Sequence, residues 1–243
     1  MTREEWVAKC QHWKAKWPVM QPEYLDDTHG LNIYAVLEAI HQHSPDDAVI
    51  MADAGSAYYM VPQAYKFKAG QRLVMSQSQG DMGWALPAAI GVAKAGAKNV
   101  IAIMGDGSFM SNMQELAVIR EHNLPIKIII LNNKGYLSIK NTQEKFYGNV
   151  HGVDSDTGLW FPDFPQIAEA FEIDATKVWS IPTANRYFPK AFLKTSPIIL
   201  DVLCAKSQQI LPSQSFKDGK QAPLHDMMPF LSDEELAAEM VNK

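Results

Sequence analysis

The sequence has few of the features that mark a secreted, membrane-bound or nucleic-acid-binding protein. It holds 2 cysteines among 243 residues, Cys10 and Cys204, too few for a disulfide framework or a zinc site. No apolar run approaches the ~18 residues of a membrane span, and the first residues lack the apolar core of a signal peptide. The formal net charge of -5, without a stripe of Lys and Arg, argues against nucleic acid or an anionic membrane as a partner. These absences predict a cytoplasmic protein.

Several common catalytic motifs are also missing. The sequence contains no Gly-x-Ser-x-Gly elbow, no Gly-x-Gly-x-x-Gly loop and no Walker loop. Its 7 histidines show no spacing typical of metal ligands. The chemistry of this chain must therefore be sought in another pattern.

Apolar strands alternate with helices along most of the chain. Strands are predicted at 48–52, 72–76, 99–104, 125–131, 176–180 and 198–203, and helices at 32–42, 57–65, 85–94, 112–122, 164–171 and 185–193. This alternation is typical of an α/β fold, a doubly wound, mostly parallel sheet flanked by helices. At 243 residues the chain is long enough for one large domain of this kind with extensions.

Three segments are predicted along the chain. Residues 1–28 form an aromatic-rich lead-in, residues 29–205 form the α/β domain, and residues 206–243 form a tail. The tail contains prolines and no obvious strand, and it ends in a helix after Ser232. The polar, glycine-dotted stretch 134–163 is assigned no helix or strand.

The most informative pattern joins the ends of two apolar strands. The run Gly105-Asp106-Gly107-Ser108 follows the strand at 99–104, and Asn132-Asn133 follows the strand at 125–131. Open α/β sheets bind ligands at the carboxyl ends of their strands, so these side chains are expected to meet at one edge. One carboxylate and one amide oxygen beside diphosphate oxygens make an oxygen-only site of the kind Mg²⁺ prefers.

The residues around this run suit a phosphate. Gly105 and Gly107 let the backbone approach a ligand closely, and Ser108 can offer a hydroxyl and its N–H. A helix is predicted to begin near Asn112, with Ser111 to Gln114 as its capping box, and its N-terminus points at the same place. The pattern therefore predicts a site for Mg²⁺ and a diphosphate.

Gly-Asp-Gly followed after 24 residues by Asn-Asn resembles the fingerprint of thiamine diphosphate (ThDP) enzymes. The resemblance implies that Mg²⁺ is held by Asp106, Asn133 and the main-chain carbonyl of Gly135. A second segment, Gln79 to Gly91, resembles the part of acetolactate synthase-type ThDP enzymes that holds the aminopyrimidine ring.

This resemblance implies a role for each residue that would hold the cofactor. Met82 corresponds to the apolar wedge beneath the cofactor, and the Gly80 carbonyl would accept a hydrogen bond from the 4′-amino group. The loop that binds the terminal phosphate falls on Gly55, Ser56 and Ala57, and Asp53 before it is assigned only turn formation or capping. The full cofactor-binding set is Gly55, Ser56, Ala57, Gly80, Met82, Gly105, Asp106, Gly107, Ser108, Asn133, Gly135 and Tyr136.

The segment Tyr136 to Tyr147 occupies the position where acetolactate synthases carry substrate-facing groups. The tryptophan that favours a larger second 2-oxo acid in that family falls on Thr142, which is the candidate substrate-side residue. This departure argues against strict acetolactate synthase specificity. With Phe161-Pro-Asp-Phe164, the segment is similar to acetolactate synthase-like proteins of uncertain substrate found among sugar and surface-polysaccharide genes.

The resemblance implies a lyase or transferase that decarboxylates a 2-oxo acid and transfers the remaining unit to an acceptor. Catalysis by ThDP also requires a Glu on a pyrimidine-binding domain, and the resemblance covers only about the C-terminal third of the usual enzyme. No catalytic residue is therefore expected in this chain, and the Glu is expected on a separate pyrimidine-domain subunit or within a homo-oligomer.

Several interpretations of the missing domain stay open. The chain fits a split enzyme, as in two-subunit sulfopyruvate decarboxylases, or a piece of a longer protein, and the opening Met favours the first. A ThDP-binding module without catalysis is a third interpretation. The tryptophans of the lead-in, Trp6, Trp13 and Trp17, fit either a docking surface or packing against their own domain.

Overall fold

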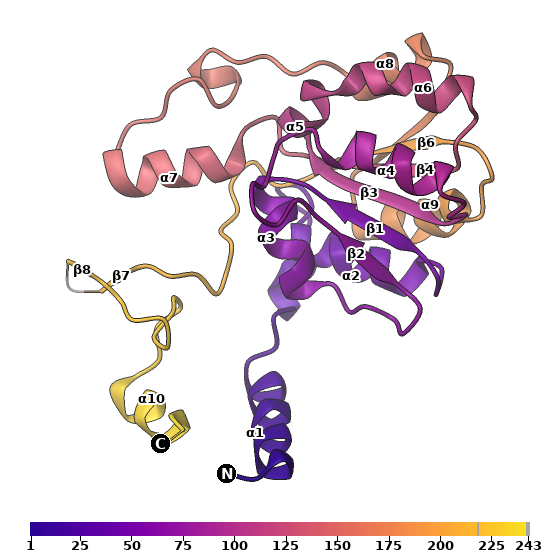
Figure 1. Ribbon diagram of the computed structural model, residues 1–243. Coiled ribbons are helices and arrows are strands. Elements are labelled where there is room, and N and C mark those ends of the chain that lie inside the picture. Colours follow the sequence, from indigo (N-terminus) through magenta and orange to yellow (C-terminus); the bar gives the residue numbers. More distant parts are fainter. Residues whose placement is uncertain (218, 242–243) are drawn as a thin grey trace. The chain divides into compact units, whose positions relative to one another are not determined.

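A computed structural model describes residues 1–217 and 219–241 (Figure 1). The chain forms two compact units, Met20–Gln208 and Met1–Val19 with Gln209–Lys243. The predicted boundaries lie after residues 28 and 205, whereas the compact units divide after residues 19 and 208. Residues 218, 242 and 243 of the predicted tail lie outside the described part.

The larger unit is built on a sheet of six parallel strands in the order β2-β1-β3-β4-β6-β5. The central strands β3 and β4 are rich in Ile and Val and are buried almost throughout, as expected for parallel strands covered on both faces. Their bounds are β1 Val49–Ala52, β2 Arg72–Val74, β3 Val100–Gly105, β4 Ile126–Asn132, β5 Asp174–Val178 and β6 Ile198–Leu203. In register, Gly105 pairs with Leu131 and Asn132 with Leu203.

Helices cover both faces of the sheet, which confirms the predicted doubly wound α/β fold (Figure 1). On one face, α4 (Ala85–Lys94), α6 (Leu116–Glu121) and α8 (Phe164–Ala170) share one buried apolar cluster with β3 and β4. On the other face lie α2 (Ile33–His43), α3 (Gly55–Ala64) and α9 (Ile181–Phe192), of which α2 packs against both α3 and α9. Short 3-10 turns are η1 (Pro22–Leu25), η2 (Met113–Glu115) and η3 (Ser155–Thr157).

A short helix that was not predicted, α5 (Asp106–Ser111), begins within the Gly-Asp-Gly run. The helix predicted at 112–122 corresponds to η2 and α6, but its capping box is absent, because Asn112 makes no side-chain capping bond at the start of η2. The side chain of Asn112 instead donates to the carbonyl of Gly83 at 3.0 Å, and the Ser111 hydroxyl bonds back to the carbonyl of Gly107 at 3.3 Å. Because its side chain is bound to a distant turn, Asn112 stands at the N-cap position of η2 without a side-chain capping bond.

A second departure is helix α7, Leu137–Tyr147, which occupies part of the stretch that was assigned no helix. The helix ends at Gly148, whose left-handed conformation and N–H bond to the carbonyl of Gln143 form a common C-terminal cap. Figure 1 shows α7 lying beside the sheet, whereas α4 lies over it.

The smaller unit contains helices from both ends of the chain. Helix α1 spans Arg3–Lys16, where the lead-in was assigned no helix, and it is capped by Thr2 and Glu5. Helix α10, Asp233–Glu239, begins after Ser232 as predicted, and its Glu239 carboxylate accepts hydrogen bonds from four side chains of α1, namely Lys9, His12, Trp13 and Lys16. The tail also forms a short antiparallel pair, β7 (Phe216–Lys217) and β8 (Lys220–Gln221), where no strand was expected.

None of the helices in residues 1–217 and 219–241 combines the length and the apolar character that crossing a bilayer would require.

Candidate functional site

The carboxyl ends of β1, β3 and β4 open into a cavity of about 290 Å³. Three helices begin at its wall, since Gly55 of α3, Asp106 of α5 and Leu137 of α7 all line it. Of the twelve predicted cofactor-binding residues, those that line the cavity are Gly55, Ser56, Gly80, Met82, Gly105, Asp106, Gly107, Ser108, Asn133, Gly135 and Tyr136. The structure therefore brings together residues that are up to 81 positions apart, from Gly55 to Tyr136.

Two predicted residues lie away from this wall. Ala57 is buried in α3 with 1% of its surface exposed and is not part of the lining. Thr142 lies on the exposed surface of α7, where its hydroxyl donates to the carbonyl of Ser138 at 2.9 Å. Its side chain is thus separated from the cavity by the first turn of the helix.

Asp106 links two of the predicted metal-binding positions. Its Oδ1 accepts from the N–H of Gly107 at 2.7 Å, and its Oδ2 accepts from the N–H of Gly135 at 3.1 Å. The side chain is 1% exposed, and burial raises the pKa of this carboxyl to about 6. A bound cation would reverse this effect, because positive charge stabilises the ionised carboxylate.

The two asparagines at the end of β4 have different surroundings. The Asn132 side chain donates to Oδ1 of Asp201 on β6 at 2.7 Å and accepts from the N–H of Lys134 at 3.2 Å. Asn133, one residue later, lines the cavity. This division follows from the alternation of side chains along a strand, and it leaves Asn133 as the one of the pair that can contact a ligand.

Two glycines are required by the geometry of the cavity wall. Gly55 has a φ of +56°, a conformation that other residues adopt at a cost. Gly107 has no such φ, but a Cβ at this position would overlap the ring of Tyr136. The backbone of the Gly-Asp-Gly run therefore lies directly against an aromatic ring from the opposite wall.

Asp53, predicted only to form or cap a turn, lies directly behind this site. The residue follows β1 and is fully buried, and its Oδ2 accepts from the Ser108 hydroxyl at 2.6 Å. Its Oδ1 accepts from the N–H of Ala54 at 2.7 Å, and burial raises the pKa of Asp53 to about 6. An Asp placed directly between an apolar strand and a glycine turn is the signal that could have identified it.

The bond to Asp53 also changes the expectation for Ser108. The Ser108 hydroxyl has one proton, which it donates to Asp53, and its oxygen accepts from the N–H of Gly83 at 2.7 Å. What remains for a phosphate is the backbone N–H of Ser108.

A different serine has an unused hydroxyl at the cavity. Ser138 lies in the first turn of α7 and lines the cavity, and its buried Oγ has no hydrogen-bond partner among the described residues. Buried hydroxyls are normally paired, so this atom is suited to a ligand oxygen. The hydroxyl and the three helix N-termini fit an anionic group in the cavity.

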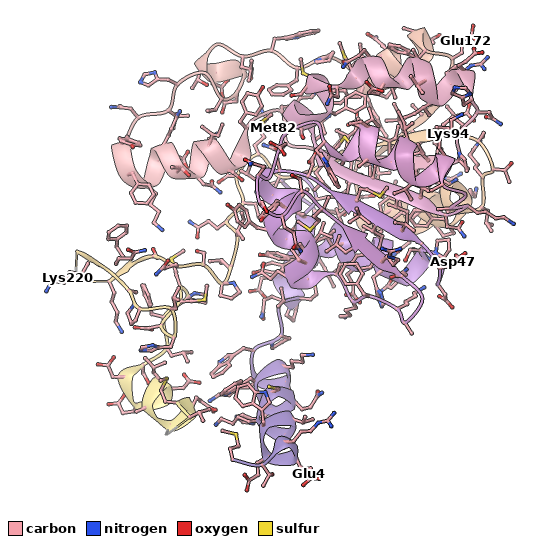
Figure 2. The ribbon with its side chains drawn as sticks, in the orientation of Figure 1. Glu4, Asp47, Met82, Lys94, Glu172 and Lys220 are labelled. Carbon is pink, nitrogen blue, oxygen red and sulfur yellow. The ribbon has the colours of Figure 1, made fainter. Side chains whose placement is uncertain are left out.

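Apolar side chains also line the cavity and remain exposed. Met82, Tyr59 and Ile139 are 40%, 54% and 45% exposed. Figure 2 labels Met82, whose neighbour Gly83 is bonded to Ser108 at the start of α5. A ligand ring or another protein surface could cover these exposed apolar side chains.

The comparisons with known proteins identify the family of this chain. The family model for the thiamine pyrophosphate enzyme, C-terminal TPP binding domain, matches residues 53–202. The acetolactate synthase large subunit of Lactococcus lactis is 30% identical over 214 residues, which cover 86% of this chain and 35% of that protein. Acetolactate synthase 2, chloroplastic, of Zea mays is 32% identical over 195 residues, which cover 76% of this chain and 30% of that protein.

The chain thus spans about a third of the length of the curated relatives that it matches. The family match begins at Asp53 and ends on β6, so it includes the whole of the cavity wall from the first glycine turn to the Asn pair. The predicted resemblance to the acetolactate synthase-like group is confirmed. The chain belongs to the family of thiamine pyrophosphate enzyme C-terminal domains, whose cofactor is thiamine diphosphate with Mg²⁺ as its usual partner.

Proposed function

We propose that this chain is the diphosphate-binding part of a ThDP- and Mg²⁺-dependent enzyme of the acetolactate synthase-like group that acts on 2-oxo acids. The observation that carries the proposal is one cavity at which Asp106, Asn133 and Gly135 meet the N-termini of three helices. Helix N-termini favour anions, and an oxygen-only ligand set favours Mg²⁺.

The charges of the cavity support a metal between protein and cofactor. Among the described residues that line it, Asp106 is the one with a full charge, and the lining holds no Lys or Arg. A diphosphate beside a bare carboxylate would be repelled, so a cation is needed to join the two. We assign Mg²⁺ to Asp106, to the Asn133 side chain and to the Gly135 carbonyl, and the diphosphate to the backbone N–H groups of the Gly-rich turns.

The remaining cofactor residues would orient the ring. Gly80 and Met82 lie on one turn of the lining, where Met82 would support the cofactor from below and the Gly80 carbonyl would face the aminopyrimidine. When bound, ThDP supplies the electron sink for decarboxylation, so the part of this chain is to bind and orient it.

The catalytic Glu is proposed to come from outside this chain. No Glu lies among the described residues of the lining, and the relatives are about three times as long as the matched part. The exposed side chains of Tyr59, Met82 and Ile139 support a partner that covers the mouth of the cavity. That partner is a pyrimidine-binding domain, whether a separate subunit or the rest of a longer chain.

The metal assignment is tested by titrating ThDP into the chain with Mg²⁺ in a calorimeter. Asp106→Ala should abolish Mg²⁺-dependent binding, because it removes the one charged ligand. Asp47→Ala is the matched control, since this exposed carboxylate is bonded to Asn99 near the other end of β1 and should leave affinity unchanged. Equal affinity of the Asp106→Ala variant and the wild type would refute the assignment.

The partner requirement is tested by assaying pyruvate decarboxylation with the chain alone and with candidate pyrimidine-domain chains. We expect activity only in the mixture. Activity of the isolated chain would contradict the proposal, and cofactor binding without activity in any mixture, on pyruvate or sulfopyruvate, would identify a ThDP-binding module.

A further inference from the structure

Three turns meet behind the cavity wall at the carboxylate of Asp53. Asp53 begins the strand-to-helix turn that leads from β1 into α3, Ser108 belongs to the run that opens α5, and Gly83 belongs to the turn before α4. The three turns come from different strands, and the residues that join them are buried, with Asp53 0% and Ser108 4% exposed.

Hydrogen bonds connect these turns in one chain of donors and acceptors. The N–H of Gly83 donates to the Ser108 hydroxyl at 2.7 Å, and that hydroxyl donates to Asp53 at 2.6 Å. The other Asp53 oxygen accepts from the N–H of Ala54 in its own turn at 2.7 Å. A longer contact of 3.5 Å joins the N–H of Ala85 to the same oxygen that binds Ser108.

We propose that Asp53 is a positioning residue: through the Ser108 hydroxyl it fixes the turn that carries Met82 and the Gly-Asp-Gly run relative to each other. The Ser108 hydroxyl serves this connection and does not bind the phosphate. The proposal rests on the proposed function for its consequence, cofactor binding, but the connection itself belongs to the cofactor-free chain.

The position of Gly83 explains why the connection matters for the cofactor. Gly83 directly follows Met82, so the bond from its N–H to Ser108 limits where the Met82 backbone can lie. Ser108 is two residues from Asp106, so the same bond limits the distance between the proposed ring support and the proposed metal ligand. When binding groups are held in place before the ligand arrives, less conformational entropy is lost on binding.

The test is amide hydrogen exchange on the cofactor-free chain, read on peptides that cover residues 80–88. Asp53→Asn keeps the shape of the side chain but replaces one acceptor oxygen by an NH₂ donor, so it cannot accept from both Ala54 and Ser108. We expect exchange in residues 80–88 to be at least tenfold faster in Asp53→Asn and in Ser108→Ala. Exchange in β4, Ile126–Asn132, should stay unchanged, which separates a local effect from general loss of stability.

Four further variants sharpen this test. Ser108→Thr keeps the hydroxyl and should restore slow exchange in residues 80–88. Ser111→Ala removes a hydroxyl from the same helix, and Asp47→Asn changes a carboxylate before the same strand, so neither should alter the turn. The double variant of Asp53 and Ser108 should exchange no faster than either single variant, because both act through one chain of bonds.

Unchanged exchange of residues 80–88 in both Asp53→Asn and Ser108→Ala would overturn the proposal. A general increase of exchange that includes β4 would also overturn it, because Asp53 would then serve overall stability. ThDP titration in the presence of Mg²⁺ tests the consequence, and at least a tenfold loss of affinity is expected for both variants. A wild-type chain that binds no ThDP would refute the proposed function while the exchange result still decides the role of Asp53.

Discussion

The two sides of the cavity differ in how they are held. On the side of β1 and β3, Asp53, Asp106 and Ser108 are at most 4% exposed, and each makes hydrogen bonds to other parts of the wall. On the side of α7, Phe146 and Tyr147 are 53% and 73% exposed, and Figure 1 shows the helix beside the sheet.

Helix α7 is joined to the rest of its unit by fewer buried groups. Its Lys140 forms an ion pair with Asp154 at 2.9 Å, and the Asn141 side chain donates to the carbonyl of Gln208 at 2.8 Å. The buried side therefore holds the groups proposed to bind phosphate and metal in place in the cofactor-free chain, whereas the α7 side has polar and apolar groups without such fixed partners.

The largest expected effect comes from the point where the two sides touch. Gly107→Ala would place a Cβ against the ring of Tyr136, which also packs edge-on against Phe161 with centroids 5.9 Å apart. Because the ring must move, we expect the free energy of unfolding to fall by about 1–3 kcal/mol. Chemical denaturation of the cofactor-free chain measures this change.

Gly105→Ala is the matched control for that prediction. No atom lies within 4 Å of the place where its Cβ would stand, so its stability should equal that of the wild type. Adding Tyr136→Ala to Gly107→Ala should recover part of the loss, because it removes the overlapping ring. Equal stability of the Gly105→Ala and Gly107→Ala variants would show that the two sides are not in tight contact.

The second prediction concerns the charge buried on the β1 side. Burial raises the pKa of Asp53 to about 6, whereas an unfolded Asp has a pKa of about 3.9. The folded state therefore binds a proton more tightly than the unfolded state, and stability is lost as pH rises between those two values. From pH 5 to pH 7.5 the contribution of Asp53 should fall by about 1–2 kcal/mol.

Asp53→Asn removes this titration. Between pH 5 and pH 7.5 the unfolding free energy should fall further in the wild type than in the variant. The difference between the two falls should be about 1–2 kcal/mol. Asp106 titrates in both proteins and cancels in the difference, and Asp47→Asn should follow the wild type. Parallel curves for the wild type and Asp53→Asn would mean that Asp53 carries no buried charge.

Some residues of the site could be predicted from the sequence and others could not, depending on whether their contacts are local. The strands β3 and β4 are almost wholly apolar runs of mostly branched residues, and the Gly-Asp-Gly run and the Asn pair stand at their ends, so the proposed metal-binding residues follow from local pattern. Asp53 was missed because its partner Ser108 is 55 residues away in sequence, and such a bond leaves no periodic signal.

The helices near the site were harder to place, for two physical reasons. Helix α5 was not predicted, and the helix predicted from Asn112 lacks its capping box because the Asn112 side chain, a good capping group in isolation, binds the carbonyl of Gly83 instead. Helix α7 was overlooked because its sequence is mainly polar, although Gly148 stands where a helix C-terminal cap is expected. A tertiary contact prevented the capping box at Asn112, whereas the local signal at Gly148 could have predicted the end of α7.

The smallest expected effect belongs to the α7 side. The Ser138 Oγ has no partner among the described residues, so Ser138→Ala should change the unfolding free energy of the cofactor-free chain by less than about 0.5 kcal/mol. If this hydroxyl binds a phosphate oxygen, the same variant should lose about 0.5–1.5 kcal/mol of binding energy, a weakening of ThDP affinity of roughly two- to twelvefold. Calorimetric titration with Mg²⁺ measures the second quantity.

Ser108→Ala is the natural comparison, because it removes a serine hydroxyl from the other side of the same cavity. That hydroxyl is bonded at both ends, so its loss should speed amide exchange in residues 80–88 of the cofactor-free chain, whereas loss of the Ser138 hydroxyl should not. A drop in stability for Ser138→Ala would place its hydroxyl in the structure of the free chain. Unchanged affinity would mean that the phosphate is held by the β1 and β3 side alone. The α7 side would then contribute only its exposed apolar side chains, and no polar group, to ligand or partner binding.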